Sequence, residues 1–379
     1  MSQFYNPVRL YFEANGIAEL ASRLVRHYGA ENRVLVLTRG SEVEKSHVLM
    51  PIMKALEGTN VYMKELQLSN PDLTDIIHLT KELKSFDYEL VIAIGGGSVM
   101  DMAKALIAMK ENRLTSEEDL REAITEERYL QQENVIPWIG IPTTSGTGSE
   151  VTSWATVWDK EKGVKYSISN PKLYARYALI VPELTQSMPL RLSVITSLDA
   201  LCHATEAYWS VRTNPITRSY ALHAIERIVT YLPLLKEDAH HLECRKQLAM
   251  ASVYAGLAFS NTMTTACHSI SYPLTLIHGI EHGIAASITL GAVFKLNQHN
   301  IVEIDSLLKV FGVEAPADVQ RKIIEIYEGY QISTQLRDYG VTSKHIEELA
   351  ERAYTKGRMN NNPVIPSKQQ VEALLMALL

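Results

Sequence analysis

The first half of the chain alternates short apolar runs with longer amphipathic stretches. The clearest run is Leu-Val-Ile-Ala-Ile at 90–94, which is followed directly by glycine. Short runs rich in branched residues are typical of buried parallel strands, and the amphipathic stretches between them are typical of helices. Strand and helix in this order indicate βαβ units. The pattern predicts strands at 33–38, 61–65, 90–94 and 135–141, and helices at 48–56, 72–85 and 100–109.

Near residue 185 the strand signals stop and long helical periodicities follow. They predict helices at 192–211, 215–232, 241–259, 264–277, 283–296, 319–327 and 343–356. We therefore predict an α/β domain with a mostly parallel sheet over residues 1–183, followed by an all-helical domain over residues 184–379. The segment 110–134 is expected to be a surface excursion, because its charges are dense and its apolar period is weak.

Composition narrows the class of protein. The 379 residues are 46% hydrophobic and 21% charged, which excludes wholesale disorder. The net charge of −6 argues against binding nucleic acid or anionic membranes. The three cysteines have no CxxC spacing, so neither a disulfide scaffold nor a zinc knuckle is expected. The sequence shows no signal peptide and no apolar run of about 20 residues, which predicts a cytoplasmic protein.

Two glycine- and hydroxyl-rich segments each follow a predicted strand. The first is Gly95-Gly96-Gly97-Ser98, where a strand gives way to a helix, and the second spans 142–150. Glycines let backbone N–H groups approach an anion closely, and the following helix N-terminus adds further donors. A tight turn and an N-capped polar loop are the structural alternative. Two such loops after two strands of one sheet favour a nucleotide site.

Four residues of the second half are candidate metal ligands. Asp199 and His203 are four residues apart, on one face of a predicted helix, and His268 and His282 lie 14 residues apart. Pro273 and Gly279 are expected to turn the chain between the two histidines. One carboxylate and three imidazoles suit Fe²⁺ or Zn²⁺ with an open coordination position. Ordinary structural histidines are the alternative, since the chain has 12 of them.

Four motifs in this order resemble the iron-dependent (group III) alcohol dehydrogenase family, over about residues 5–379. They are the segments 95–104 and 142–150, Asp199-x₃-His203, and His268-x₁₃-His282-Gly283. The resemblance implies an N-terminal dinucleotide-binding domain, a C-terminal metal-binding domain and a cleft between them. It implies an oxidoreductase that interconverts a small aldehyde and a primary alcohol, with Fe²⁺ (or Zn²⁺) and NADPH or NADH. The family also implies a homodimer.

The resemblance assigns roles by position. It makes Asp199, His203, His268 and His282 the metal ligands. The residues that would face the coenzyme are Gly96, Gly97, Ser98, Asp101, Thr143, Thr144, Thr147, Ser149 and Lys165. Many family members have a histidine of the proton relay four residues after the third ligand, where this chain has Tyr272. Tyr272 through its hydroxyl, His278, or the ribose with water are the candidates for passing the proton.

A narrower likeness links the chain to the phosphonoacetaldehyde reductase branch of the family. It is carried by the segments 150–159, 264–274 and 357–363. This branch implies reduction of phosphonoacetaldehyde to 2-hydroxyethylphosphonate. The dianionic substrate would need donors, for which Arg358 and Asn361, within the run 360–362, are candidates, with Lys165 as a further one. A solvated arginine in a C-terminal turn is the structural alternative.

The coenzyme preference is predicted from the end of the first strand. Arg39 and Ser41 follow it, where NAD-specific sites place a carboxylate on the ribose 2′-hydroxyl. Arg39 and Ser41 could instead bind a 2′-phosphate, which favours NADPH. Within the dehydrogenases, the alternative is a general short-chain alcohol or lactaldehyde enzyme. A lyase resembling dehydroquinate synthases, or a nucleotide-binding regulator without chemistry, would be functions of other classes.

Overall fold

The computed structural model describes residues 3–27, 32–40, 46–67, 70–112, 114–355 and 357–379. The chain forms two compact units. The α/β unit consists of Asn6–Thr144 and Ser149–Thr185. The helical unit consists of Met1–Tyr5, Ser145–Gly148 and Gln186–Leu379, so a short piece of the second glycine-rich loop belongs to it.

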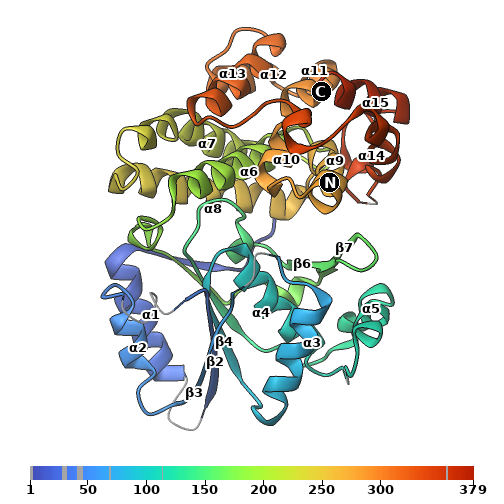
Figure 1. Cartoon of the computed structure of the whole chain (residues 1–379). Coiled ribbons are helices and arrows are strands. Elements are labelled where there is room, and N and C mark those ends of the chain that lie inside the picture. The colour runs from blue at the N-terminus through green and yellow to red at the C-terminus, as the bar shows by residue number, and fades with distance from the viewer. Residues whose placement is uncertain (1–2, 28–31, 41–45, 68–69, 113, 356) are drawn as a thin grey trace. The chain divides into compact units, whose positions relative to one another are not determined.

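The α/β unit is built on a six-stranded parallel sheet with the order β1-β8-β5-β4-β2-β3 (Figure 1). The strands are β1 Arg9–Phe12, β2 Arg33–Thr38, β3 Asn60–Glu65, β4 Leu90–Gly95, β5 Trp138–Pro142 and β8 Tyr177–Ile180. Strands β6 Trp154–Asp159 and β7 Val164–Ser169 pair as a separate antiparallel hairpin. The four predicted strands are confirmed as β2 to β5.

Both faces of the sheet are covered by helices, and successive side chains of a strand pack on opposite faces. Val34 and Val36 pack with the cluster that includes α1 Glu13–His27 and α2 Met50–Ala55. Leu35 and Leu37 pack with the opposite cluster. That cluster contains α3 Leu73–Glu82, α4 Gly97–Met109 and α5 Glu117–Thr125. Figure 1 shows α1 and α2 on one side of the sheet, and α3 and α4 on the other. Burial on both faces explains why these strands are continuous apolar runs rather than alternating ones.

The strand order reverses between β2 and β4. From β2 the chain runs to β3 at the sheet edge, then returns to β4 on the other side of β2. Thr38 of β2 pairs with Ile94 of β4, so Arg39 after β2 and the glycine turn after β4 lie at the carboxyl ends of neighbouring strands. Ligands of doubly wound sheets bind at such a switch point, outside the carboxyl ends of the strands.

The surface excursion expected at 110–134 is not irregular throughout. The segment contains α5, which begins with a capping box at Ser116 and buries Leu120 and Ile124. Arg121 is also buried, and its Nε donates to Asp159 at 2.7 Å. The dense charges therefore include a buried ion pair with the β6–β7 hairpin.

In the helical unit the described part of Gln186–Leu379 contains helices and no strand. The helices are α6 Leu190–Trp209, α7 Pro215–Tyr231, α8 Leu242–Thr262, α9 Ala266–His278, α10 His282–Ser287, α11 Leu290–Asn297, α12 Ile304–Phe311, α13 Pro316–Gly329, α14 Ile346–Arg352 and α15 Lys368–Met376. The predicted fold class, a mostly parallel α/β domain followed by a helical one, is confirmed. Within the described residues, no helix combines the length and apolar character needed to cross a membrane.

Two expectations for this unit need correction. Pro273 lies inside α9 and does not turn the chain; Gly279, with φ of 66°, ends the helix. The single helix expected at 283–296 is divided into α10 and α11. The reason is tertiary packing, because Gly283 touches the backbone of α6 whereas Gly291 touches α13.

Candidate active site

Three of the four candidate metal ligands converge in the helical unit. Asp199 lies in α6, His268 in α9, and His282 begins α10. Nε2 of His268 is 3.4 Å from Oδ1 of Asp199, and Nε2 of His282 is 3.9 Å from the same oxygen. One ligand atom from each residue lies within 4.8 Å of the other two. Close packing of Gly283 on Ile195 of α6 brings His282 to this position.

His203 borders this group of three. Its Nδ1 is 3.8 Å from Oδ2 of Asp199, one helical turn away on α6. Its ring stacks between Phe259 and His268, with centroid distances of 4.1 and 4.3 Å. The fourth predicted ligand, His203, therefore lies beside the group of three, and its nearest carboxylate there is that of Asp199.

The electrostatics of the cluster suit a divalent cation. Burial acts to raise the pKa of Asp199, but the three histidines lower it below its usual range. Burial acts to lower the pKa of His268, but the carboxylates of Glu206 and Asp199 raise it to about 10. Oδ1 of Asp199 and Nε2 of His268 are buried without a hydrogen-bond partner. Unsatisfied buried polar atoms that face one another indicate a group to be bound between them, and an N/O donor set fits Fe²⁺ or Zn²⁺.

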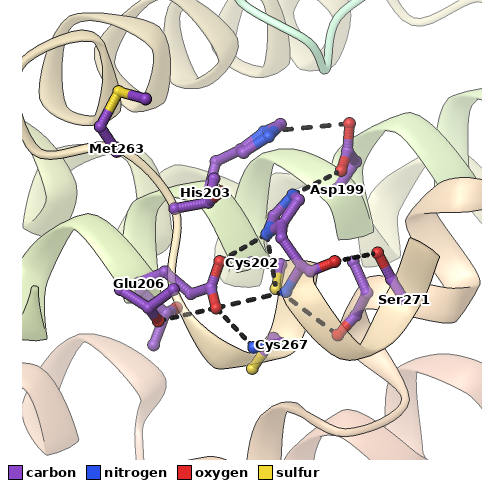
Figure 2. Close-up of polar contacts among 12 residues, drawn as sticks. Asp199, Cys202, His203, Glu206, Met263, Cys267 and Ser271 are labelled. Atoms are coloured by element: carbon purple, nitrogen blue, oxygen red, sulfur yellow. Dashed lines mark hydrogen bonds and ion pairs between the residues drawn. The ribbon is translucent and has the colours of Figure 1, made fainter. Parts of the chain in front are cut away.

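Sequence reasoning missed Glu206. Its Oε2 lies 2.5 Å from Nδ1 of His268, on the side of the ring opposite to Asp199. Figure 2 shows Asp199, His203 and Glu206 along α6 with these contacts. Asp199, His203 and Glu206 are at positions i, i+4 and i+7, the spacing of one helix face, which is the signal that could have found it.

The glycine turn has the form expected of an anion site. Gly96 precedes α4 as its N-cap, and no side chain caps this helix. Gly97 and Ser98 form the first turn and are half-buried. A Cβ at Gly96 would lie 3.0 Å from Oγ1 of Thr144, so the two loops are in contact. Thr143 also bonds through its N–H to the carbonyl of Gly95 at 3.0 Å.

Other residues predicted to face the coenzyme have varied surroundings. Oδ1 of Asp101 accepts a hydrogen bond from Oγ of Ser149 at 2.7 Å, and the fully buried Lys104 donates to Ser149 at the same distance. Thr147 belongs to the short segment of the helical unit, and Lys165 is half-buried in β7. Arg39 is exposed, and Ser41 lies outside the described residues.

The two candidates for proton transfer differ in surroundings. Tyr272 is buried, and its ring stacks on His282 with centroids 6.1 Å apart. His278, at the end of α9, has its ring 4.8 Å from that of His345. Partial burial, and then the neighbouring His345, lower the pKa of His278. Tyr272 is therefore beside the ligand cluster, whereas the ring contact of His278 is with another histidine.

Arg358 and Asn361 are both buried in the helical unit. Nη1 of Arg358 donates to the carbonyl of Gly357 at 3.2 Å, and among the described residues no carboxylate pairs with this guanidinium. Asn361 donates its amide hydrogens to the carbonyls of Thr262 and Thr264, at 2.6 and 3.1 Å. These contacts give Asn361 a role in holding the turn before α9 and leave its amide no hydrogen for a substrate.

Known proteins match the chain along nearly all of its length. The family described as iron-containing alcohol dehydrogenase matches residues 7–182, and its C-terminal part matches residues 193–379. The choline dehydrogenase of Bacillus subtilis is 30% identical over 368 residues, which is 93% of this chain and 90% of that protein. The chain belongs to the iron-containing alcohol dehydrogenase family. The resemblance predicted from the four motifs is confirmed.

As a member of the iron-containing alcohol dehydrogenase family, the chain is an NAD(P)-dependent oxidoreductase. A phosphonoacetaldehyde reductase of Streptomyces viridochromogenes is 29% identical over 322 residues, covering 81% of this chain and 80% of that protein. The crystal structure of sulfoacetaldehyde reductase from Bifidobacterium kashiwanohense in complex with NAD⁺ superimposes with a TM-score of 0.85. It is 28% identical, and the match covers 100% of this chain and 98% of that one.

Proposed function

We propose that the protein reduces a small aldehyde carrying an anionic group, phosphonoacetaldehyde in the first place, to the primary alcohol with NADPH or NADH. The observation that carries this proposal is the convergence of Asp199, His268 and His282, with His203 beside them. These four residues would hold Fe²⁺ (or Zn²⁺). When bound, the ion supplies electrostatic stabilisation where negative charge develops on the substrate oxygen, and the nicotinamide supplies the hydride.

The protein's own groups would orient the substrate and move the proton. Tyr272 is the nearer proton donor of the two candidates, because its ring stacks on His282 while His278 contacts His345. Its hydroxyl would protonate the product oxygen. We expect Tyr272→Phe to lower kcat and leave metal content unchanged, and His278→Ala to leave both near the wild-type values. The reverse pattern would assign the relay to His278.

The metal assignment is tested by His268→Ala. The variant should lose bound metal and turnover while retaining its circular dichroism spectrum, because it removes a ligand whose Nε2 faces Asp199. His299→Ala, which removes an exposed histidine of the same unit, is the matched control and should keep both. Metal content is measured by plasma mass spectrometry. Full activity of metal-free wild-type protein would overturn the mechanism.

The proposal of an anionic substrate rests on Arg358. It is 7% exposed, and a buried guanidinium without a carboxylate partner is unfavourable unless an anion reaches it. The loop that carries Arg358 contacts α9, the helix of His268. The N–H of Thr355 in this loop donates to Oγ of Ser269 at 3.0 Å, and Ser269 follows His268 in the sequence. Among relatives, one named for phosphonoacetaldehyde and one named for sulfoacetaldehyde accord with this charge.

Substrate choice is tested by Arg358→Gln on a panel of aldehydes. KM for phosphonoacetaldehyde should rise roughly 10- to 100-fold, the equivalent of one charge-assisted hydrogen bond, while KM for propanal should hardly change. Wild-type protein that prefers neutral aldehydes or lactaldehyde would favour the general alcohol dehydrogenase instead. Net consumption of NADPH at 340 nm separates both from a lyase that regenerates its coenzyme.

The preference for NADPH is tested at Arg39. This exposed residue leaves β2 at the same sheet edge as the glycine turn, where its charge could pair with a 2′-phosphate. Arg39→Asp should shift the ratio of kcat/KM values toward NADH by at least about tenfold. Lys84→Asp changes an exposed charge of the same unit, just before the amino end of β4, and should leave the ratio unchanged. An unchanged ratio in both variants would contradict the assignment.

A further inference from the structure

One fully buried carboxylate, that of Glu206, connects the ligand cluster to the start of α9. Its Oε2 lies 2.5 Å from Nδ1 of His268. Its Oε1 accepts from the N–H of Cys267 at 2.7 Å and from the hydroxyl of Thr265 at 2.8 Å. Neither oxygen faces solvent, because the residue is 0% exposed. An ionised carboxylate has no hydrogen to give, so each of these partners is the donor.

This geometry determines which nitrogen of His268 is available for a metal. In the neutral ring, which is the form that binds a metal, a hydrogen on Nδ1 that Glu206 accepts leaves the lone pair on Nε2. Nε2 is the atom that faces Asp199, at 3.4 Å, and it has no hydrogen-bond partner. Nδ1 also lies 3.8 Å from Sγ of Cys202, which is a longer and weaker contact than the one with Glu206.

We propose that Glu206 is a positioning residue that fixes the tautomer and the ring orientation of His268. The inference rests on the proposed metal site, which it deepens. A carboxylate behind a ligating imidazole raises the basicity of the ligand and limits its rotation. Glu206 acts through His268 and does not itself contact the reacting atoms.

The same carboxylate fixes the helix that carries the ligand. The N-cap of α9, Thr265, makes no side-chain cap, and Glu206 accepts from the N–H of Cys267 in its place. The hydroxyl of Thr265 in turn accepts from the indole N–H of Trp209 at 2.9 Å. Trp209, Thr265, Glu206 and His268 thus form one chain of hydrogen bonds between α6 and α9. Glu206 therefore positions His268 through two contacts. One is with the backbone N–H of the neighbouring Cys267, and the other is with Nδ1 of the His268 ring.

Two substitutions separate the role of the carboxylate from that of the cap. Glu206→Gln keeps the size of the side chain. If its oxygen stays on the N–H of Cys267, its amide hydrogens face Nδ1 of His268 and favour the opposite tautomer. Thr265→Val removes the hydroxyl bonded to Oε1 but leaves the contact of Oε2 with His268, so it is the matched control. Both variants are compared by thermal unfolding in the metal-free form.

The experiment titrates metal-free full-length protein with Zn²⁺ by calorimetry. Glu206→Gln should weaken binding roughly 10- to 100-fold, as loss of such a partner typically does, and Thr265→Val should stay within about threefold of wild type. In the Zn²⁺ form of wild-type protein, ¹⁵N NMR of the histidines should show His268 protonated at Nδ1 and coordinated through Nε2. This measurement needs no variant, so it decides the question even if Glu206→Gln does not fold.

The outcomes distinguish this inference from the proposed function. Wild-type protein that binds neither Zn²⁺ nor Fe²⁺ would overturn the metal site itself. Wild-type binding with equal affinity in Glu206→Gln, or coordination of His268 through Nδ1, would overturn the role of Glu206 and leave the metal site standing. Equal weakening in Glu206→Gln and Thr265→Val would also overturn it, because the effect would then belong to the helix cap.

Discussion

Among single residues outside the ligand cluster, Glu150 and Lys104 have pKa values shifted toward neutral pH. Both are fully buried in the α/β unit. Burial raises the pKa of Glu150 to about 7, against an ordinary value of 4.5, although Lys104 acts in the opposite direction. Burial also lowers the pKa of Lys104 to about 8. Such groups make the stability of the unit depend on pH near neutrality.

The sign of this dependence follows from proton binding. Between pH 4.5 and about 7 the native state holds a proton on Glu150 that the unfolded state has released. The free energy of unfolding therefore falls as the pH rises through this window, by at most about 1.4 kcal/mol per pH unit. Above about pH 8 the native state binds fewer protons at Lys104 than the unfolded state, so stability rises again toward pH 10.5.

Glu150→Gln tests this prediction. The variant should have a flatter dependence of urea-unfolding free energy on pH between 5 and 7 than wild type, because its side chain cannot ionise. Glu133→Gln, an exposed site of the same unit, serves as control and should reproduce the wild-type slope. Parallel pH profiles for all three proteins would contradict the assigned burial of an ionisable Glu150.

The sequence predicted individual site residues unevenly. The family motifs identified Asp199, His268 and His282, which the structure brings together. Glu206 was missed because a glutamate on a helix is usually solvated, and only the fold shows that it is buried against His268. Asn361 was assigned to the substrate by its place in the tail, but its bonds to Thr262 and Thr264 come from tertiary structure that no local pattern reveals.

At the scale of elements, the turn between α8 and α9 is strained. Met263 has φ of 64° and ψ of 172°, a region used almost only by glycine. Figure 2 shows its side chain directed away from Cys267. Asn361 bonds to the carbonyls on both sides of Met263, and Oγ of Ser210 donates to Thr262 at 3.1 Å. These bonds offset the strain and set where α9 begins.

Substitutions at Met263 and Asn361 should change the free energy of unfolding in opposite directions. Met263→Gly should raise the free energy of unfolding by about 1 kcal/mol, because glycine adopts this backbone without strain. Asn361→Ala should lower it by about 1–3 kcal/mol, because two buried carbonyls lose their donor. Urea unfolding of the metal-free proteins measures both. A loss of stability in Met263→Gly would show that the side chain contributes more by packing than the backbone loses.

The sequence predicted the elements that have a clear local pattern of apolar residues, and it missed those that tertiary contacts define. Strands β2, β4 and β5 were found because each is an apolar run that is almost wholly buried. Strand β3 is a half-buried edge strand, found by its short run of Val61, Tyr62 and Met63. Strand β1 lies at the sheet edge with an exposed Phe12, and β8 has only four residues, so neither carries a strong signal. The break between α10 and α11 arises from contacts of Gly283 and Gly291 with different helices, which periodicity cannot reveal.

For the whole molecule, the family predicts a homodimer. Light scattering after size exclusion should then give a mass twice the 42.5 kDa of one chain, at all concentrations in the micromolar range. A mass of one chain at these concentrations would contradict this expectation. The result is independent of the metal site, since all four candidate ligands belong to one chain.

The division into two units predicts where each ligand acts. All four candidate metal ligands belong to the helical unit, whereas the glycine turn and Arg39 belong to the α/β unit. Binding slows local opening of the elements that supply the contacts. Zn²⁺ added to metal-free protein should therefore slow amide hydrogen exchange in α6, α9 and α10. NADPH alone should slow it in the segment 95–100, after β4.

Hydrogen-exchange mass spectrometry distinguishes these effects, and His268→Ala is the control. In that variant the response to Zn²⁺ should disappear, while the response to NADPH should persist, because the glycine turn is unchanged. Protection by Zn²⁺ that is strongest in β2 to β4, or that persists in His268→Ala, would mean that the ion binds elsewhere. Since each ligand reports on a different unit, a protein that binds only one of them would still show which of the two assignments holds.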